Sequence, residues 1–584
     1  MKTSSPALST LLLLIVPFAP PLNAQDEAGE LESFFDAVEV KIVNVDVIAV
    51  DKQGNPVTDL EMEDFRVYED GEPVEITNFH RAGEEAALLQ ARAGVEATDP
   101  AATEATPTGP PPLTMALFVD NTSLVPGSRR QMLKDLEEFL DSQLQDNDRI
   151  ILLSYDGRLS VEQQPTDSVD DLLAAIGDIS EAQASGALRT ASYRNVLREI
   201  TQDTSAGATG GFGLALDPTP AIAEASLQAI RLYAEESHTN TLRTLAAVRE
   251  ALGMLSALPG PKAMIYAGAG MTQNPSAGLI QAWESRFSGL AGDVGGSFVA
   301  IRELAEFDAT DPVQDVARVA NTHRITLYTL NPSDAIGGLT PVEIQGMDSA
   351  GRRTLTPQMQ SVEISNRAAV MNLMAASTGG AASTGAMDAL LDTVRRDFDS
   401  LYSLAYQPDD ESRDKDHRKI EVEVLRPGVE LRYRRHYRET TRDERLADRT
   451  RSALLLEGAD NPLGVVLEFG TPEEGEGGFA MVPVMVRVPM SALTLLPQGE
   501  AHEGRMSLFI GVRDERGRLA PVSKQTLPLR IPNADLYNAL SQVGGYTFTL
   551  KLRPMAHTVA VTVHDEVGQV ESVAQGSLEA PDFG

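Results

Sequence analysis

Short apolar runs alternate with helically spaced apolar residues through the middle of the chain. From Leu113 onward, each run is followed by a segment in which apolar residues recur every three or four positions. The runs predict strands buried on both faces, and the spaced segments predict amphipathic helices. This alternation is typical of a mostly parallel sheet with crossover helices. The predicted strands are 115–119, 149–155, 262–266 and 324–330, and the predicted helices are 129–144, 167–179, 221–258, 312–323, 368–378 and 387–397.

Three further strands are predicted after these helices, at 402–406, 420–424 and 429–433. We expect them to extend the same sheet at its edge, with the charged loop 409–417 protecting that edge from pairing with other chains. The α/β domain is therefore predicted to span 113–438. Within it, 180–217 fits no regular element and is interpreted as an insertion. Its glycine-rich part lacks the Lys-Ser/Thr ending of a phosphate-binding loop, which favours a flexible loop.

The pattern changes to a period of two on both sides of this domain. Near the N-terminus, Val43, Val45, Val47 and Ala49 alternate with polar residues before close turns, which predicts a small β-sandwich-like module over 35–80. Residues 81–112 are rich in Ala, Glu, Thr and Pro and are predicted to form a linker. A charged connector is expected at 439–460, and a second β-sandwich-like domain at 461–570, with strands at 465–469, 481–488, 506–512, 546–552 and 557–563.

The first residues have the pattern of a secretory signal. Lys2 precedes an apolar segment over 11–16, and small residues around Ala24 mark a cleavage position. The apolar segment is shorter than the roughly 20 residues that a membrane-spanning helix needs. We therefore predict a signal peptide over 1–24, a secreted or periplasmic mature protein, and no membrane span.

Composition narrows the possible partners. The 584 residues carry a formal net charge of −36, which repels phosphate backbones, so nucleic acid is not an expected partner. The length predicts about three or four domains. The chain has no cysteine, so it has no disulfides despite the predicted export.

The candidate chemistry lies where the strand 115–119 ends, in the sequence Asp120-Asn121-Thr122-Ser123. Ligands of open α/β sheets bind beyond the carboxyl ends of the strands. A carboxylate and two hydroxyls at this place form a candidate site for a hard cation. In the alternative interpretation, Asp120 only caps the turn and accepts backbone N–H bonds.

Other motifs do not support catalysis. No two of the eight histidines have the i, i+4 spacing of a zinc pair, and no serine lies in a nucleophile elbow. The alternating basic and aromatic residues of 432–438 are interpreted as a strand whose long cationic side chains cover a sheet edge or pair with acidic neighbours. We therefore expect a protein that is not an enzyme.

The order of several segments is similar to that in a known family. These segments are VTDLEMEDFRVYEDGEPVEITNF, FVDNTS, DRIILLSYDGRLSVEQQPT, LPGPKAMIYAGAG, VANTHRITLYTLNP, LMAASTGG and RKIEVEVLRPGVELRYRRHY. Over nearly its whole mature length, the chain resembles secreted bacterial proteins of the Acidobacteria type that carry a von Willebrand factor type A (VWA)-like domain. The resemblance implies a Rossmann-like sheet flanked by helices, and binding rather than catalysis.

The resemblance also implies a metal-ion-dependent adhesion site, in which Mg²⁺ is held by an Asp-x-Ser-x-Ser loop, a Thr and a second Asp. Asp120 matches the first ligand, Thr122 can replace the first Ser, and Leu124 stands at the second Ser, although Ser123 is a neighbour. The candidates for the Thr are Thr239, Thr241 and Thr244, with Thr241 as the working choice. The third loop, 267–270, has no carboxylate. Such a degenerate site is expected to bind Mg²⁺ weakly or not at all.

From these observations we predict an exported, non-enzymatic protein that binds an unidentified protein partner in adhesion or assembly. The alternative is an accessory subunit of cell-envelope assembly or of a secreted hydrolase system, with a ligand-binding β domain. Sugar-binding faces expose aromatic side chains. The only Trp, Trp283, lies in the α/β domain, which argues against a sugar-binding β domain.

Overall fold

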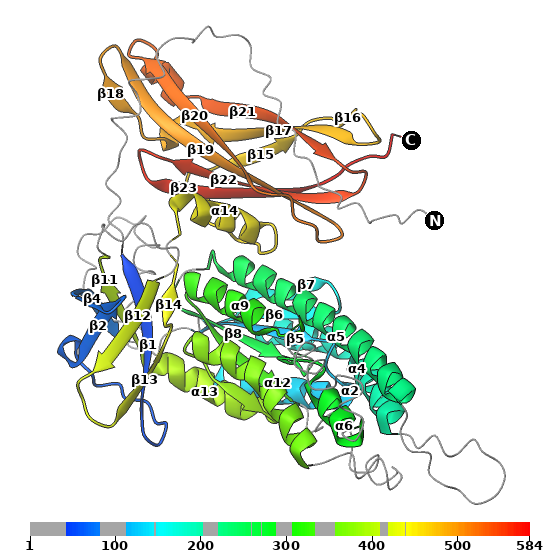
Figure 1. Ribbon diagram of the computed structural model, residues 1–584. Coiled ribbons are helices and arrows are strands. Elements are labelled where there is room, and N and C mark those ends of the chain that lie inside the picture. Colours follow the sequence, from blue (N-terminus) through cyan, green and yellow to red (C-terminus); the bar gives the residue numbers. More distant parts are fainter. Residues whose placement is uncertain are drawn as a thin grey trace, which may run out of the picture. The chain divides into compact units, whose positions relative to one another are not determined.

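The computed structural model describes residues 42–81, 113–144, 148–201, 220–258, 260–269, 271–287, 306–332, 357–408, 418–438 and 440–583. The predicted signal peptide, nearly all of the predicted linker and the glycine-rich segment lie outside these ranges. The chain forms two compact units (Figure 1). One contains 41–252 and 258–439, and the other contains 440–584 together with 253–257. Each unit is described by itself below.

A six-stranded sheet forms the centre of the first unit, in the order β10-β9-β8-β5-β6-β7. All neighbouring strands are parallel except β6 and β7, which are antiparallel. Chain order reverses between β5 and β8, the arrangement of a doubly wound sheet. The strands are β5 (Thr114–Asp120), β6 (Arg149–Tyr155), β7 (Leu159–Thr166), β8 (Lys262–Ala267), β9 (Ile325–Asn331) and β10 (Ala382–Thr384).

Helices cover both faces of this sheet (Figure 1). The helices α2, α3 and α13 share one core with Met115, Leu117 and Tyr328. Thr329 points to the opposite face from Tyr328, and its hydroxyl donates to the Met371 carbonyl of α12 at 3.2 Å, so α12 lies on that other face. The helices are α2 (Pro126–Gln143), α3 (Val169–Glu181), α4 (Gly186–Thr201), α5 (Pro220–Leu255), α6 (Ala277–Phe287), α9 (Thr310–Thr322), α12 (Pro357–Ser377) and α13 (Met387–Asp399).

Local sequence signals explain several helix boundaries. Pro126 is the first residue of α2, where its missing N–H costs nothing. The Ser168 side chain caps α3 by accepting from the Asp171 N–H at 3.3 Å. After α12, Gly379 has a φ of +84°, a conformation that glycine adopts without strain. The strands and helices that the sequence predicted in this region are present, although α12 begins earlier than the predicted 368, whereas β7, β10, α4 and α6 were not predicted.

The prediction that 402–433 extend the central sheet was wrong. These strands pair instead with the N-terminal strands in two four-stranded sheets, β13-β1-β11-β4 and β14-β12-β2-β3 (Figure 1, blue and yellow-green strands). The β domain thus combines the predicted N-terminal module with the end of the predicted α/β domain. Its elements are β1 (Val43–Asp51), η1 (Met62–Asp64), β2 (Phe65–Glu69), β3 (Glu72–Val74), β4 (Ile76–Arg81), β11 (Leu401–Tyr406), β12 (Arg418–Val424), β13 (Val429–Tyr433) and β14 (His436–Tyr437).

Arginine side chains attach this β domain to the α/β domain. Arg324, just before β9, forms an ion pair with Asp46 of β1, with 2.6 Å between Nη2 and Oδ1. Burial alone would raise the pKa of Asp46, but the charge and hydrogen bond of Arg324 outweigh it, so the pKa is lowered. Arg434, which precedes β14, donates to the backbone carbonyls of Asn321 and Asn44. The predicted sheet-edge cations of 432–438 therefore include residues that join two domains.

The second unit is a β-sandwich with a core of aliphatic residues from both sheets. One sheet has the order β15-β17-β16, with β21 paired to β17, and the other has the order β18-β19-β22-β23, with β20 paired to β19. The elements are β15 (Val466–Phe469), β16 (Glu473–Glu474), β17 (Ala480–Pro489), η6 (Met490–Ala492), β18 (Leu496–Gln498), β19 (Ala501–Asp514), β20 (Ser523–Pro532), α15 (Leu536–Leu540), β21 (Val543–Leu552), β22 (Ala556–Asp565) and β23 (Val570–Glu579).

Two predictions for this region need correction. The charged connector at 439–460 contains a helix, α14 (Arg442–Ala453), which packs on β19 and β22. A capping box at its start explains it, because the Thr441 side chain accepts from the Glu444 N–H and the Glu444 side chain accepts from the Thr441 N–H. The last strand ends at Glu579, so the sandwich continues beyond the predicted limit of 570.

No helix within the described ranges is both long enough and apolar enough to cross a membrane.

Candidate functional site

Asp120 is the last residue of β5, beside the position where the strand order reverses. Crevices at such positions are the usual ligand sites of doubly wound sheets. The Asp120 side chain, however, is completely buried. Its contacts therefore decide whether it can serve a ligand.

Both carboxylate oxygens of Asp120 accept hydrogen bonds from the protein itself. Oδ1 accepts from the Thr122 N–H at 3.0 Å and from the Thr122 hydroxyl at 2.6 Å. Oδ2 accepts from the Tyr266 hydroxyl at 2.8 Å. Burial raises the pKa of Tyr266 well above its ordinary value, and the negative charge of Asp120 raises it further. The Tyr266 hydroxyl therefore stays protonated and donates to Asp120.

Ser123 is also bonded within the protein. Its hydroxyl donates to the Asp120 carbonyl at 3.3 Å and accepts from the Ala269 N–H at 3.1 Å. The third loop thus approaches Ser123 with its backbone. At Gly268, a Cβ would lie 2.4 Å from the Tyr266 hydroxyl oxygen, so only glycine leaves room for Tyr266 in this position.

The helix α4 packs against the same loop. The Gly186 N–H donates to the Leu124 carbonyl at 3.2 Å, and a Cβ on Gly186 would lie 2.2 Å from the Ser123 carbonyl oxygen. Arg189, one turn further, donates from Nη2 to the Thr122 hydroxyl oxygen at 3.0 Å. Residues 186–201 were predicted to be irregular, and that prediction was wrong. They form a helix that brings a guanidinium group to the Asp120 loop.

Arg129 of α2 holds the loop from a third side. Its Nη1 donates to the Asn121 side-chain oxygen at 2.8 Å, and its Nη2 donates to the carbonyls of Ser180 and Ala182 at 2.8 and 2.7 Å. Burial lowers the pKa of Arg129. The side chain is 3 % exposed, and these acceptors compensate for its desolvation.

The three candidate threonines lie within the long helix α5. Thr239 is exposed, whereas Thr241 and Thr244 are buried. None of the hydrogen bonds recorded for the described residues joins these threonines to Asp120, and the Thr244 hydroxyl has no recorded partner. The structure therefore brings Asp120, Thr122 and Ser123 together and does not join Thr241 to them.

A divalent cation does not fit this arrangement. Mg²⁺ needs near-octahedral oxygen ligands with available lone pairs. Asp120 is already the acceptor of three donors, and the Arg189 guanidinium places a positive charge beside the Thr122 hydroxyl. Elsewhere in the described part of the chain, no group of three or more His, Cys, Asp or Glu side chains could hold a metal.

Comparisons with known proteins do not place the chain in a family. No family model matches the sequence, and no curated protein matches it. Three similar solved structures are a Bacteroides uniformis β-glucuronidase, the type V pili tip protein Mfa5 from Porphyromonas gingivalis and the human COPII-coat protein Sec24c.

These three similarities are weak. The glucuronidase is 10% identical with a TM-score of 0.14, and the match covers 31% of this chain but only 19% of that chain. The pilus protein is 9% identical with a TM-score of 0.22, covering 93% and 78%. The coat protein is 8% identical with a TM-score of 0.17, covering 80% and 44%. Similarities at this level carry no argument about function.

Two side chains that change the site most, Tyr266 and Arg189, were not predicted from the sequence. Tyr266 ends the apolar part of a predicted strand and was counted with that strand. Arg189 lies in the segment interpreted as an insertion. A single arginine on an unpredicted helix gave no signal of its contact with Thr122.

Proposed function

We propose that this protein is an exported, non-enzymatic binding protein whose α/β domain is VWA-like and contacts a protein partner without a metal ion. The observation that carries the proposal is that both carboxylate oxygens of Asp120 accept hydrogen bonds from the protein itself. Because Tyr266 and Thr122 donate to both of its carboxylate oxygens, the mostly buried loop supports the neighbouring surface rather than forming an open coordination site. The partner is then recognised by side chains around the loop.

The strand order supports the VWA-like part of the proposal. The resemblance implied a Rossmann-like sheet flanked by helices, and a doubly wound order with one antiparallel edge strand is compatible with it. Asp120, which matches the first ligand of the VWA metal-binding loop, lies at the end of β5, beside the position where the strand order reverses. This is the position from which a domain with this topology contacts its ligand.

The burial of the polar residues supports binding rather than catalysis. Asp120 and Tyr266 are both completely buried, so neither can reach a substrate. Next to the loop, Leu188 of α4 is 70% exposed. Covering this side chain with a partner would remove apolar surface from water, which favours binding. Leu188 is therefore the residue at which we propose that the partner binds.

The test is affinity capture of partners from the envelope fraction of the producing bacterium. The baits are the wild-type chain, Leu188→Asp, and Leu425→Asp as a matched control, each with and without EDTA. Leu425 is 51% exposed on the β domain, so its replacement changes charge and hydropathy in the same way at a different surface.

We expect the wild type and Leu425→Asp to retain one partner equally well, with or without EDTA, and Leu188→Asp to retain at least tenfold less. Loss of the partner in EDTA would contradict metal independence, and equal retention by both variants would contradict the proposed surface.

Export is tested separately by mass spectrometry of the mature N-terminus, which should be Gln25.

A further inference from the structure

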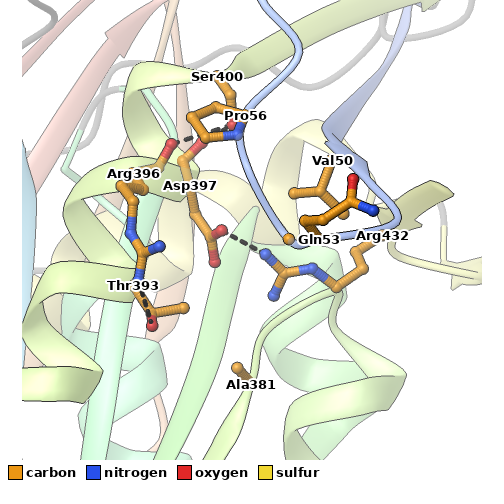
Figure 2. Close-up of a pocket in the computed structure, with 10 residues that line it drawn as sticks. Val50, Gln53, Pro56, Ala381, Thr393, Arg396, Asp397, Ser400 and Arg432 are labelled. Carbon is orange, nitrogen blue, oxygen red and sulfur yellow. Dashed lines mark hydrogen bonds and ion pairs between the residues drawn. The ribbon is translucent and has the colours of Figure 1, made fainter. Parts of the chain in front are cut away.

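A cavity of about 350 Å³ lies between α13 and the β domain (Figure 2). Its volume falls in the range of small-molecule sites. Val50, Gln53 and Pro56 come from β1 and its following turn, and Ala381 precedes β10. The remaining side chains come from α13, from Ser400 at its C-terminal end, and from β13. Gln53, Pro56 and Arg396 are exposed, so the cavity opens to solvent along this rim.

The cavity has two cationic walls. Figure 2 shows Arg396 of α13 and Arg432 of β13 on opposite sides, with Asp397 between them. Asp397 is 3% exposed, and its Oδ2 accepts from the Tyr328 hydroxyl at 2.9 Å while its Oδ1 accepts from Arg432 Nη2. Asp397 therefore holds Arg432 in place, and each of its oxygens accepts from a donor of the protein.

Both arginines keep donors for a ligand. Arg432 contacts Asp397 through Nη2 of its guanidinium group. Arg396 donates from Nε to the Asp392 carbonyl at 3.1 Å and from Nη2 to the Thr393 hydroxyl at 3.5 Å. Nη1 of each arginine has no recorded partner among the described residues. A guanidinium group pairs well with carboxylates, because its N–H groups match the two carboxylate oxygens.

The charge of the cavity favours an anion. Two guanidinium groups outnumber the one carboxylate, and burial raises the pKa of Asp397 although Arg432 opposes this shift. The carboxyl end of α13 contributes a partial negative charge of about half an electron, which is smaller than the excess positive charge. The local charge is therefore opposite to the net charge of −36 of the whole chain.

We propose that this cavity binds a small organic dicarboxylate, with one carboxylate on Arg396 and the other on Arg432. Cations on opposite walls suit a ligand with an anionic group at each end. The apolar side chains of Val50, Pro56 and Ala381 suit the short carbon chain that joins the two groups. This site is separate from the Asp120 loop and does not depend on the proposed partner.

Calorimetry with the full chain tests the proposal, with succinate and glutarate as probes at constant ionic strength. Acetate and inorganic phosphate serve as comparison anions. The variants are Arg396→Gln, Arg396→Lys and Ala381→Leu, and the control is Arg130→Gln, which removes an exposed arginine of α2. Arg396 is exposed, so its replacement should leave the fold intact.

We expect saturable binding of at least one dicarboxylate to the wild type and to Arg130→Gln. Arg396→Gln should weaken it about tenfold, Arg396→Lys should restore part of it, and Ala381→Leu should abolish it by filling the cavity. Acetate should bind at least tenfold more weakly. The absence of saturable binding to the wild type would overturn the proposal. Equal affinity in Arg396→Gln, or phosphate binding as tight as that of the dicarboxylates, would overturn it as well.

Discussion

Two buried aspartates occupy similar surroundings at different places in the α/β domain. Asp120 accepts from the Tyr266 hydroxyl of β8, and Asp397 accepts from the Tyr328 hydroxyl of the neighbouring strand β9. Each aspartate also has an arginine close by, Arg189 through Thr122 in one case and Arg432 directly in the other. Asp397 also lines the cavity between α13 and the β domain.

The difference between the two lies in how their arginines are held. At Asp120, a short loop and α4 close over the carboxylate, so all of the donors belong to the protein. At Asp397, the arginine comes from another domain and lies beside an open space. The Asp120–Tyr266 pair therefore has a local structural role, whereas the Asp397–Tyr328 pair holds an arginine that forms one wall of the cavity. The following predictions test this contrast.

Replacement of Asp120 is expected to have the largest effect on the free energy of unfolding. Asp120→Ala leaves the Tyr266 hydroxyl and the Thr122 donors without their acceptor in a buried place, and should lower the free energy of unfolding by about 3 kcal/mol. Asp397→Ala should cost about half as much, roughly 1.5 kcal/mol, because Arg432 is partly exposed and can be solvated. Urea denaturation of both variants measures this. An Asp397→Ala variant that is the less stable of the two would contradict the contrast.

Removal of the tyrosine hydroxyls should show a smaller difference in the same direction. Tyr266→Phe leaves Asp120 Oδ2 buried without a donor and should cost about 2 kcal/mol. Tyr328→Phe should cost about 1 kcal/mol, because Asp397 retains Arg432 and its raised pKa eases protonation. Thermal and urea denaturation measure the loss of stability in each variant. Because phenylalanine keeps the aromatic ring, each loss reports on the hydroxyl alone. Equal costs would show that the two aspartates are equally dependent on their tyrosines.

The stability should depend on pH through Asp397. Its folded-state pKa is raised by burial, so its contribution to stability is fully present below the ordinary value of 3.8 and is lost as the pH rises through the folded-state pKa. The stability of the wild type relative to Asp397→Asn should therefore fall as the pH rises above 3.8 and through the raised folded-state pKa. Free energies of unfolding at a series of pH values measure this difference. A difference that stays constant, or that grows with pH, would contradict the raised pKa.

The smallest expected effect is the response to divalent cations. Titration of the wild-type chain with Mg²⁺ or Mn²⁺ should give the same heats, close to zero, as titration of Asp120→Ala, because the oxygens of Asp120 already accept hydrogen bonds. The more conservative Asp120→Asn serves as a second comparison if the alanine variant is poorly folded. Saturable heat that only the wild type gives would show that the loop opens to a metal.

Periodicity along the chain predicted the individual elements better than their partners. The strand over 149–155 was predicted from its continuous apolar run, and the helix over 387–397 from its helical pattern of apolar residues. The strand over 420–424 was also predicted, but alternation does not identify the neighbouring strand, and this strand pairs with β2. The sequence therefore predicted β12 and placed it in the wrong sheet.

The same limit applies to the candidate site. Asp120, Thr122 and Ser123 are neighbours in the chain, so their proximity was predictable. Tyr266 lies 146 positions from Asp120, and only the parallel pairing of β5 with β8 brings the two side chains together. Arg189 depends on the packing of a helix that has no strong sequence signal. The two residues that complete the network could not be predicted from local pattern.

The pairing of β1 with β11 has a consequence for the order of folding. The Leu60 N–H, next to these strands, donates to the Tyr402 hydroxyl across 342 positions of the chain. At roughly 5–20 residues per second, a ribosome needs roughly 17 to 70 seconds to add that many residues. The β domain is thus the most slowly completed part of its unit, since its first strand must wait for its last. The α/β domain between them can form earlier, and its completion brings the ends of the β domain together.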